Sequence, residues 1–198
     1  PLPPESVSGF DAVCHLAGEP VASRWTEGKK KRILESRVVG TRHLCEALAA
    51  TKEPPRVLMS ASAIGYYGNP GDAILREDSA SGEGFLADVC WQWEAATQAA
   101  SAAGIRTAQI RIGIVLSARG GALPKMIPPF RVGLGAQIGD GRQWMSWIHI
   151  QDLIGAILHI LDDKSLSGPV NMVAPAPIQN SEFTRTLAQV MSRPSLLR

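Results

Sequence analysis

Two tyrosines stand next to each other in this chain of 198 residues, and they are the only two it contains. Tyr66 and Tyr67 follow the apolar run 56–60 (RVLMS), which is typical of a buried strand. Neighbouring residues at a strand end can point in opposite directions, so one phenol can face a ligand and take part in proton transfer. The alternative is that both rings only pack beneath the segments that follow.

The histidines and cysteines do not have the spacing of a metal site. His15 and His149 lie in apolar runs without a cysteine or carboxylate placed as a fellow ligand, so hydrogen-bonded core histidines are the simpler interpretation. Cys14, Cys45 and Cys90 are odd in number and lie in apolar patterns. We interpret them as reduced packing residues of a cytoplasmic protein.

The hydrophobic pattern predicts the scaffold for these residues, an α/β fold with a doubly wound parallel sheet, because apolar runs alternate with stretches at helical spacing. Residues 1–118 are expected to form a partial dinucleotide-binding domain and residues 119–198 a small, partial substrate lobe. The expected strands are 11–17, 56–60, 106–116, 144–148 and 170–173, and the expected helices are 27–50, 85–103, 123–132, 151–161 and 181–191.

The composition argues against nucleic acid and membranes as binding partners. Twenty Lys and Arg against 18 Asp and Glu leave a net charge of +2, which gives no general attraction to nucleic acid or to an anionic membrane. No apolar stretch reaches the ~18 residues that a membrane span needs. A small-molecule substrate is the expected partner, and a homodimer is left open.

One feature of a dinucleotide domain is missing. Such a domain begins with a β-α-β unit whose glycine-rich turn places the pyrophosphate at a helix N-terminus. No G-x-G-x-x-G follows any expected strand; Gly113 and the pair 120–121 do not open a helix in the required way. Either the N-terminal β-α-β unit is absent from this chain, or the protein uses no dinucleotide.

Four segments together resemble the extended short-chain dehydrogenase/reductases of the NAD-dependent epimerase/dehydratase family. They are DAVCHLAG (11–18), SRVVGT (36–41), VLMSASAIGYYG (57–68) and GDGRQ followed by IH and D (139–152). Further short segments, such as LAGEP, PPFRVGLG and NMVAP, resemble those of one subgroup, the bacterial nucleoside-diphosphate-sugar epimerases with a mitochondrial animal counterpart. Members of the family start earlier and continue later, so we expect this sequence to be a truncated version of such a protein.

The resemblance implies a Rossmann-like fold and a bound NADP or NAD. It implies that the strand end at Ala17 and Gly18 passes under the cofactor, that Val115 offers backbone groups to the nicotinamide amide, and that Ser62 is the catalytic serine. A serine that satisfies a turn is the structural alternative for Ser62. We expect Gly18, Ser62 and the segment 113–115 to line one crevice.

Arg37 replaces the asparagine that is usual in the helix motif of the family. A guanidinium there must reach solvent, pair with a carboxylate such as Glu19 or Glu35, or meet an anion. We favour a contact with the cofactor for Arg37 and, with less support, for Arg32.

The catalytic Tyr-x-x-x-Lys pair of the family is missing, because the expected positions fall on Leu86 and Cys90, or on Phe85 after a shift by one residue. Neither Leu86 nor Phe85 can transfer a proton. Met145 and Ser146 likewise stand where nucleotide-sugar enzymes often have an Arg-Asp pair. A nucleotide-sugar substrate is therefore unexpected, unless Lys125, Arg131 or Arg142 supplies that charge.

Two functions remain open. The first is an NADP(H)-dependent oxidoreductase or epimerase-like enzyme that acts on a small, non-nucleotide substrate through Ser62 and Tyr66 or Tyr67. The second is a catalytically silent dinucleotide-binding protein with a sensor or regulatory role. Loss of the Tyr-Lys pair favours the second function, and the serine strand favours the first.

Overall fold

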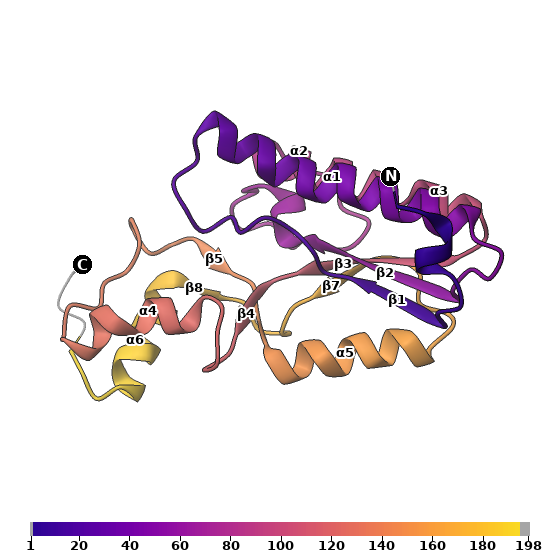
Figure 1. The fold of residues 1–198 in the computed structure, drawn as a ribbon. Helices are drawn as coiled ribbons and strands as arrows, with labels where there is room; N and C mark the ends of the chain where they lie inside the picture. The colour runs from indigo at the N-terminus through magenta and orange to yellow at the C-terminus, as the bar shows by residue number, and fades with distance from the viewer. Residues whose placement is uncertain (1, 195–198) are drawn as a thin grey trace. The chain divides into compact units, whose positions relative to one another are not determined.

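A four-stranded parallel sheet in the order β1-β2-β3-β7 lies at the centre of the computed structural model, which describes residues 2–194 (Figure 1). Its strands are β1 (Ala12–His15), β2 (Val57–Ala63), β3 (Arg106–Ile112) and β7 (Gly168–Met172). The predicted α/β fold with a parallel sheet is confirmed.

The strand register fixes which residues share a level of the sheet. β1 and β2 run parallel, with Ala12 opposite Val57 and His15 opposite Ser60. β2 is buried at six of its seven positions, as is typical of a strand covered on both faces. β1 pairs only with β2 among the described residues, so it forms an edge of the sheet.

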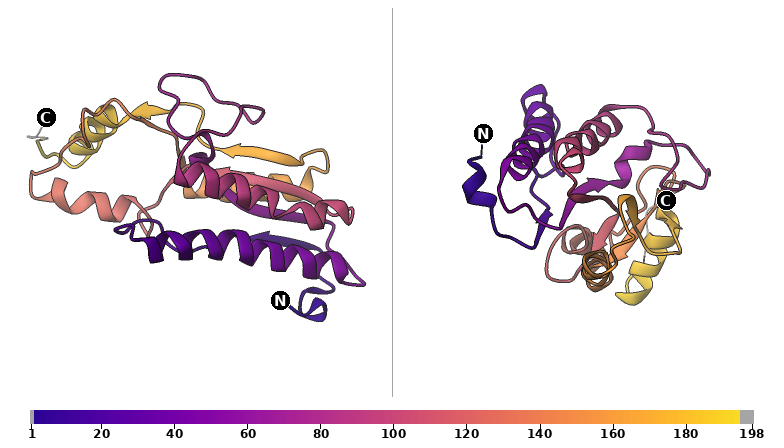
Figure 2. Two further views of the ribbon diagram at one scale, coloured as in Figure 1. Left: turned by 90° about the horizontal axis from the view of Figure 1, so that it is seen from above. Right: turned by 90° about the vertical axis from the view of Figure 1, so that its right-hand side faces the viewer.

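Helices cover both faces of this sheet. α1 (Glu27–Ala50), α2 (Phe85–Ala95) and α3 (Gln98–Ala102) lie side by side on one face (Figure 2). The part of α5 (Ile150–Asp162) from Leu158 onward lies on the other face (Figure 1). Helices on both faces are the arrangement that parallel strands require, because both of their faces must be removed from water.

The core between the helices and the sheet is apolar. Cys45 and Leu48 of α1 pack with Leu58 of β2, Ala100 of α3 and Ile105, and at least 96% of the surface of each is buried. Hydrophobic burial on this face therefore holds α1 and α3 against the sheet.

Contacts divide the chain into two compact units. The first comprises residues 2–70, 75–111 and 158–171, and the second comprises residues 71–74, 112–157 and 172–194. In the second unit two small sheets, β4 with β6 and β5 with β8, accompany two helices. These elements are β4 (Ile114–Leu116), α4 (Leu123–Arg131), β5 (Trp144–Met145), β6 (Trp147–His149), β8 (Ile178–Gln179) and α6 (Asn180–Val190).

Most of the predicted elements are present, and two are interrupted. The helix predicted over 27–50 is confirmed with its bounds. The helix predicted over 85–103 is two helices, because the Thr97 hydroxyl donates to the Glu94 carbonyl at 2.7 Å and a turn separates α2 from α3. The strand predicted over 106–116 is broken at Gly113, where a Cβ would lie 2.6 Å from the Ser146 carbonyl oxygen.

Short elements escaped prediction. Two 3₁₀ helices, η1 (Pro4–Val7) and η2 (Ile64–Tyr67), and the strand β8 were not expected, since elements this short carry little periodicity. The strand predicted over 144–148 is split into β5 and β6. None of the helices within residues 2–194 is long and apolar enough to cross a membrane.

Candidate functional site

The carboxyl ends of β1 and β2 lie at the same edge of the sheet. His15 ends β1 opposite Ser60, so Gly18 follows β1 at the same end of the sheet as Ser62, the second-last residue of β2. Ala17 and Gly18 are exposed, whereas Ser62 is buried. This register agrees with the expectation that Gly18 and Ser62 share one end of the sheet, the end at which open α/β sheets bind ligands. Their contact with a cofactor stays a prediction.

Ser62 is tied to a carboxylate within the protein. Its hydroxyl donates to Oε1 of Glu94 on α2 at 2.6 Å. Glu94 is held by Arg111 of β3, whose Nε and Nη2 donate to its two carboxylate oxygens at 2.8 and 2.9 Å. A two-point pair of this kind fixes the plane of the carboxylate, so the proton of Ser62 is directed toward Glu94.

Tyr67 belongs to the same network. Its hydroxyl accepts from Nη1 of Arg111 at 2.8 Å and donates to Oδ1 of Asn171 on β7 at 2.6 Å. Arg111 Nη1 also donates to the Glu77 carbonyl oxygen, and the Glu77 carboxylate accepts from the backbone amide of Asn171 at 2.9 Å. Tyr67 is buried, and both functions of its hydroxyl are used inside the protein.

Tyr66 is placed differently, although it is the adjacent residue. The Arg111 guanidinium carbon lies 3.6 Å from the centre of the Tyr66 ring, and the two tyrosine rings meet edge to face. Tyr66 is half-buried, and within residues 2–194 its hydroxyl has no hydrogen-bond partner. The 3₁₀ helix η2 thus places the Tyr67 hydroxyl in the hydrogen-bond network of Arg111 and the Tyr66 hydroxyl outside it.

Arg111 remains charged at the centre of this cluster. Burial lowers the pKa of its guanidinium, but the hydrogen bonds and charges of Glu94 and Tyr67 outweigh burial and raise the pKa overall. The side chain is 3% exposed. A buried charge is tolerated only when it is paired and hydrogen-bonded, and Arg111 meets that condition.

The sequence interpretation did not assign a role to Glu94 or Arg111. A signal existed for Arg111, which stands in the apolar strand RTAQIRI, where a charged side chain needs a buried partner. The identity of that partner was not readable, because it lies on a different element.

Arg37 lies against Gly18, which is three residues beyond the end of β1. Its Nη1 donates to the carbonyl oxygens of Glu19 at 2.9 Å and Ile33 at 3.3 Å, and its guanidinium lies 5.0 Å from the centre of the Trp93 ring. A Cβ on Gly18 would come within 3.1 Å of the guanidinium carbon. Glycine at position 18 therefore gives room to Arg37, a reason that the sequence did not reveal.

The charge of Arg37 has no carboxylate partner among the described residues. The Glu19 carboxylate pairs instead with Lys29 at 2.6 Å and with Arg32 at 3.5 Å, and Glu35 pairs with Lys31 at 3.7 Å. Arg37 is half-buried, and burial lowers the pKa of its guanidinium. Of the three alternatives for Arg37, the ion pair with Glu19 or Glu35 is not formed.

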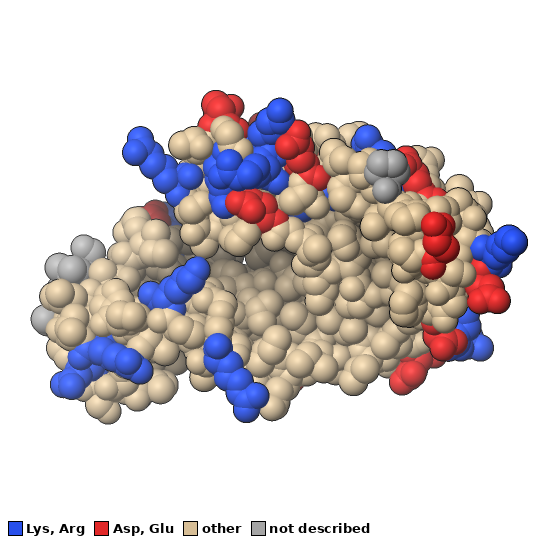
Figure 3. Space-filling model, in the orientation of Figure 1, with Lys and Arg blue, Asp and Glu red and all other residues tan. Residues whose placement is uncertain are grey.

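Basic side chains gather over the first turns of α1 (Figure 3). Arg32 is largely exposed and shares the Glu19 carboxylate with Lys29, and the hydrogen bond from Lys29 is the main reason that the pKa of Glu19 is lowered. Lys29, Arg32 and Arg37 together carry three positive charges against one negative charge at Glu19. Such an excess of positive charge favours an anionic ligand.

The helix positions that the resemblance assigns to the catalytic pair are apolar in character. Leu86 and Cys90 face Gly65, where a Cβ would lie 3.5 Å from the Leu86 Cβ and 3.7 Å from the Cys90 Sγ. Burial raises the pKa of the Cys90 thiol to about 11, although the Ser62 hydroxyl and the charge of Arg37 oppose that rise. Cys90 is therefore a neutral thiol near pH 7, so it cannot replace the charged lysine of the catalytic pair.

The remaining candidates have structural roles or lie in the second unit. His15 hydrogen-bonds to the Thr41 hydroxyl at 3.0 Å, and burial lowers its pKa; His149 accepts from the Gln151 amide. No cluster of potential metal ligands occurs within residues 2–194. Val115 lies in β4, paired with Ile148. Met145 is buried and contacts Asn180 through its sulfur.

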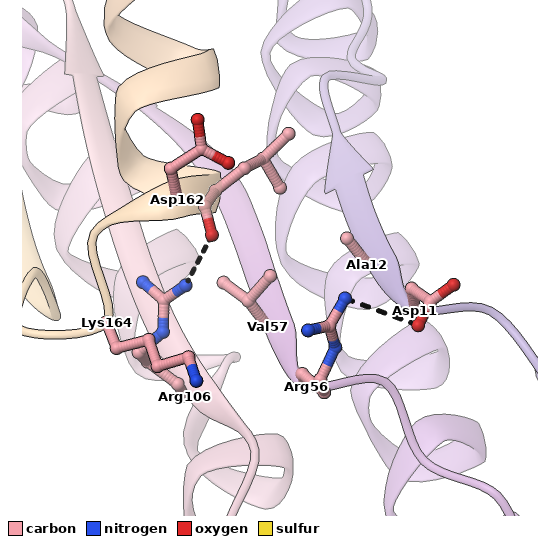
Figure 4. Close-up of a pocket in the computed structure, with 8 residues that line it drawn as sticks. Asp11, Ala12, Arg56, Val57, Arg106, Asp162 and Lys164 are labelled. Atoms are coloured by element: carbon pink, nitrogen blue, oxygen red, sulfur yellow. Dashed lines mark hydrogen bonds and ion pairs between the residues drawn. The ribbon is translucent and has the colours of Figure 1, made fainter.

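A pocket opens at the opposite end of the sheet, where β1, β2 and β3 begin (Figure 4). Three of its charged groups are engaged with the protein: Arg56 pairs with Asp11 at 3.3 Å, and Arg106 donates to the carbonyl oxygens of Leu161 and Leu166. This pocket is distinct from the edge that carries Gly18 and Ser62.

The parallel sheet with helices on both faces defines a Rossmann-like fold, and the sequence comparison defines the family. The model of the NAD dependent epimerase/dehydratase family matches residues 5–173. The chain belongs to that family. An epimerase family protein of Mycobacterium bovis is 42% identical over 98% of this chain and 64% of its own length. The chain thus spans less than two thirds of this relative.

Two solved structures are similar to the chain over nearly its whole length. The human epimerase family protein SDR39U1 with NADPH is 34% identical, with a TM-score of 0.88 over 96% of this chain and 65% of that one. The nucleoside-diphosphate sugar epimerase of Corynebacterium glutamicum is 41% identical, with a TM-score of 0.84 over 98% of this chain and 42% of that one.

Proposed function

We propose that this chain is part of an NADP(H)-dependent, epimerase-like oxidoreductase that acts on a small, non-nucleotide substrate. The observation that carries the proposal is the edge of the sheet where Gly18, with the Arg37 guanidinium against it, follows β1 and where Ser62 lies near the carboxyl end of β2. Membership of the NAD dependent epimerase/dehydratase family and the human relative with NADPH support the choice of cofactor.

The residues at this edge fit an anionic dinucleotide. Nε and Nη2 of Arg37 have no hydrogen-bond partner among the described residues. Every buried polar side-chain atom there has a partner, so these two nitrogens must reach solvent. A cofactor phosphate or ribose hydroxyl is a suitable acceptor for such donors. When bound, a nicotinamide dinucleotide supplies or accepts the hydride.

The protein would position the cofactor and supply positive charge for its phosphates. Arg37 would hold the cofactor at the strand ends, and Ala17 and Gly18 would pass beneath it. Arg32 stays a weaker candidate, because Glu19 already neutralises part of its charge. Val115 is kept as a proposed backbone contact.

A non-nucleotide substrate is proposed because Met145 does not provide the charge that a diphosphate needs. Its side chain is 5% exposed and packs on Asn180. In the same unit Trp144 donates to Asp72 and Trp147 to the Ala176 carbonyl. A cytoplasmic location and the absence of nucleic-acid partners remain proposals.

The test combines binding with turnover on the full-length protein. We expect NADPH to bind with micromolar or better affinity, measured by fluorescence, and hydride to exchange between NADPH and at least one member of a carbonyl panel. NADH serves as the matched ligand that lacks only the 2′-phosphate. Failure of both cofactors to bind would contradict the proposal.

A catalytically silent dinucleotide-binding protein is the second candidate. The neutral, buried thiol of Cys90 and the side chain of Leu86 favour it, since neither can relay a proton at neutral pH. Binding of NADPH without hydride exchange on any carbonyl compound would select this function.

A further inference from the structure

The hydrogen bonds of the candidate site account for the protons of two of its three hydroxyl groups. Ser62 has one hydroxyl proton and donates it to Glu94 at 2.6 Å. Tyr67 has one and donates it to Asn171 at 2.6 Å. A hydroxyl donates a single hydrogen bond, so neither residue has a proton left for a substrate.

These two protons cannot be released without cost. Glu94 is held by both arms of Arg111, and Tyr67 receives a further hydrogen bond from the same guanidinium. Turning Tyr67 toward a substrate would remove the hydrogen bond that Asn171 Oδ1 accepts, and turning Ser62 would remove one of the two that Glu94 Oε1 accepts. Both losses are unfavourable. The oxygen of Ser62 can still accept a hydrogen bond from a ligand hydroxyl.

Tyr66 is the exception. Its hydroxyl has no partner within residues 2–194, and every buried side-chain polar atom in that part of the chain is partnered, so this hydroxyl is open to water. The residue lies in η2, directly after the carboxyl end of β2. The hydroxyl of this half-buried residue therefore reaches water at the end of β2 that carries the proposed cofactor site.

A fixed positive charge lies under the Tyr66 ring. The Arg111 guanidinium is 3.6 Å from the ring centre and is anchored by Glu94, Tyr67 and the Glu77 carbonyl. A preorganised cation stabilises negative charge that develops nearby during a reaction. Arg111 is placed to do this for the oxygen of Tyr66.

We propose that Tyr66 is the proton-transfer residue of this site, and that Ser62, Tyr67, Glu94 and Arg111 position it. The proposal rests on the function proposed above. In reduction, the O–H bond of Tyr66 breaks and its proton goes to the substrate carbonyl oxygen as the carbonyl π bond opens. The carbonyl carbon receives hydride from a reduced nicotinamide dinucleotide, which becomes oxidised. The phenolate then takes a proton from water.

The first test measures the reactivity of the phenols and needs no substrate. Tetranitromethane nitrates accessible tyrosines, and nitrated peptides distinguish Tyr66 from Tyr67 by mass. Nitration of Tyr66 ahead of Tyr67 is expected. Nitration of Tyr67 first, or at an equal rate, would overturn the proposal.

The second test compares matched variants of the full-length protein. Tyr66→Phe should slow NADPH-linked carbonyl reduction by roughly 100-fold or more, the usual contribution of a general acid, with unchanged NADPH affinity and unchanged melting temperature. Tyr67→Phe should lower the melting temperature and slow reduction much less.

The outcomes separate this proposal from the one that it rests on. If Tyr66→Phe retains wild-type turnover, the role of Tyr66 is wrong while the oxidoreductase function stands. If the wild-type protein binds NADPH but reduces no carbonyl compound, the oxidoreductase function is wrong and Tyr66 has no catalytic role.

Discussion

Arg37 has a structural role in this chain and is also the side chain that we propose to bind the cofactor. It closes the space over Gly18, bridges to the Glu19 carbonyl and stacks near Trp93, yet its charge lacks a counter-ion among the described residues. Desolvating a guanidinium without pairing it costs free energy, and this cost is offset when an anion binds. We therefore expect cofactor affinity to depend on Arg37.

Replacing Arg37 with methionine should weaken NADP(H) binding to the full-length protein by about 1.5–3 kcal/mol, the usual value of a charge-assisted hydrogen bond. Titration calorimetry measures the change. Arg42→Met is the matched control, since Arg42 is an exposed arginine of the same helix. Unchanged affinity together with a lower melting temperature would show that Arg37 serves only the scaffold.

The buried thiols make stability depend on alkaline pH. Burial raises the pKa of Cys45 from 9.0 to about 12 and that of Cys90 from 9.0 to about 11. Above pH 9 the unfolded chain loses these protons while the folded chain keeps them, so the unfolded state binds fewer protons. The free energy of unfolding must then fall as pH rises.

For each thiol, we expect the free energy of unfolding to fall by about 1.4 kcal/mol per pH unit. The fall should run from pH 9 to 11 for Cys90 and from pH 9 to 12 for Cys45. Urea unfolding at a series of pH values measures it. Cys45→Ala should be less stable at pH 7 but should lose less stability than the wild type on going to pH 11. Parallel curves for the two proteins would refute the assignment.

At the scale of elements, α1 carries much of the site, since Lys29, Arg32 and Arg37 all lie on it. Its start is fixed by Thr26, whose side chain accepts from the Lys29 amide at 3.2 Å. An N-cap of this kind satisfies an amide that would otherwise lack a partner at the first turn. The position of the basic cluster therefore depends on where the helix begins.

Thr26→Ala should lower the free energy of unfolding by about 1 kcal/mol, through loss of the N-cap. Thr51→Ala is the control at the other end of α1, where Thr51 is the C-cap residue, and should change stability by less than about 0.5 kcal/mol. Denaturant unfolding at neutral pH gives both values. Equal effects of the two substitutions would show that the cap is unimportant.

At the scale of the whole molecule, the sheet has an edge that is open among the described residues. β1 pairs only with β2, and Phe10 and Leu16 beside it are 56% and 54% exposed. An apolar edge strand can pair with a further strand, from the same chain or from another copy. The chain of residues 1–198 is therefore expected to be unstable alone or to associate through β1.

Sedimentation velocity over a range of concentrations tests this expectation. We expect association that increases with concentration and decreases in Cys14→Lys, because Cys14 is the exposed position of β1 and an edge lysine opposes strand pairing. Lys52→Ala, outside β1, should leave association unchanged. A monodisperse, monomeric and thermally stable chain would contradict the prediction.

The sequence by itself determined the alternation of strands and helices and the family. The helix 27–50 was predictable because its apolar residues repeat with the period of a helix, and the order of the sequence motifs alone indicated the family. Elements with long, regular patterns are specified locally. The break at Gly113 was not predictable, because the Ser146 carbonyl that approaches this glycine comes from another segment of the chain.

Only the tertiary structure decided which hydroxyl of the site is free. The partners that engage Ser62 and Tyr67 lie 32 to 104 residues away along the chain. Nothing in the local sequence distinguishes Tyr66 from Tyr67. The difference arises because the fold brings Arg111 and Asn171 to Tyr67 as hydrogen-bond partners and places only the face of a guanidinium against Tyr66. Such pairings depend on the packing of distant strands and helices, which no local pattern encodes.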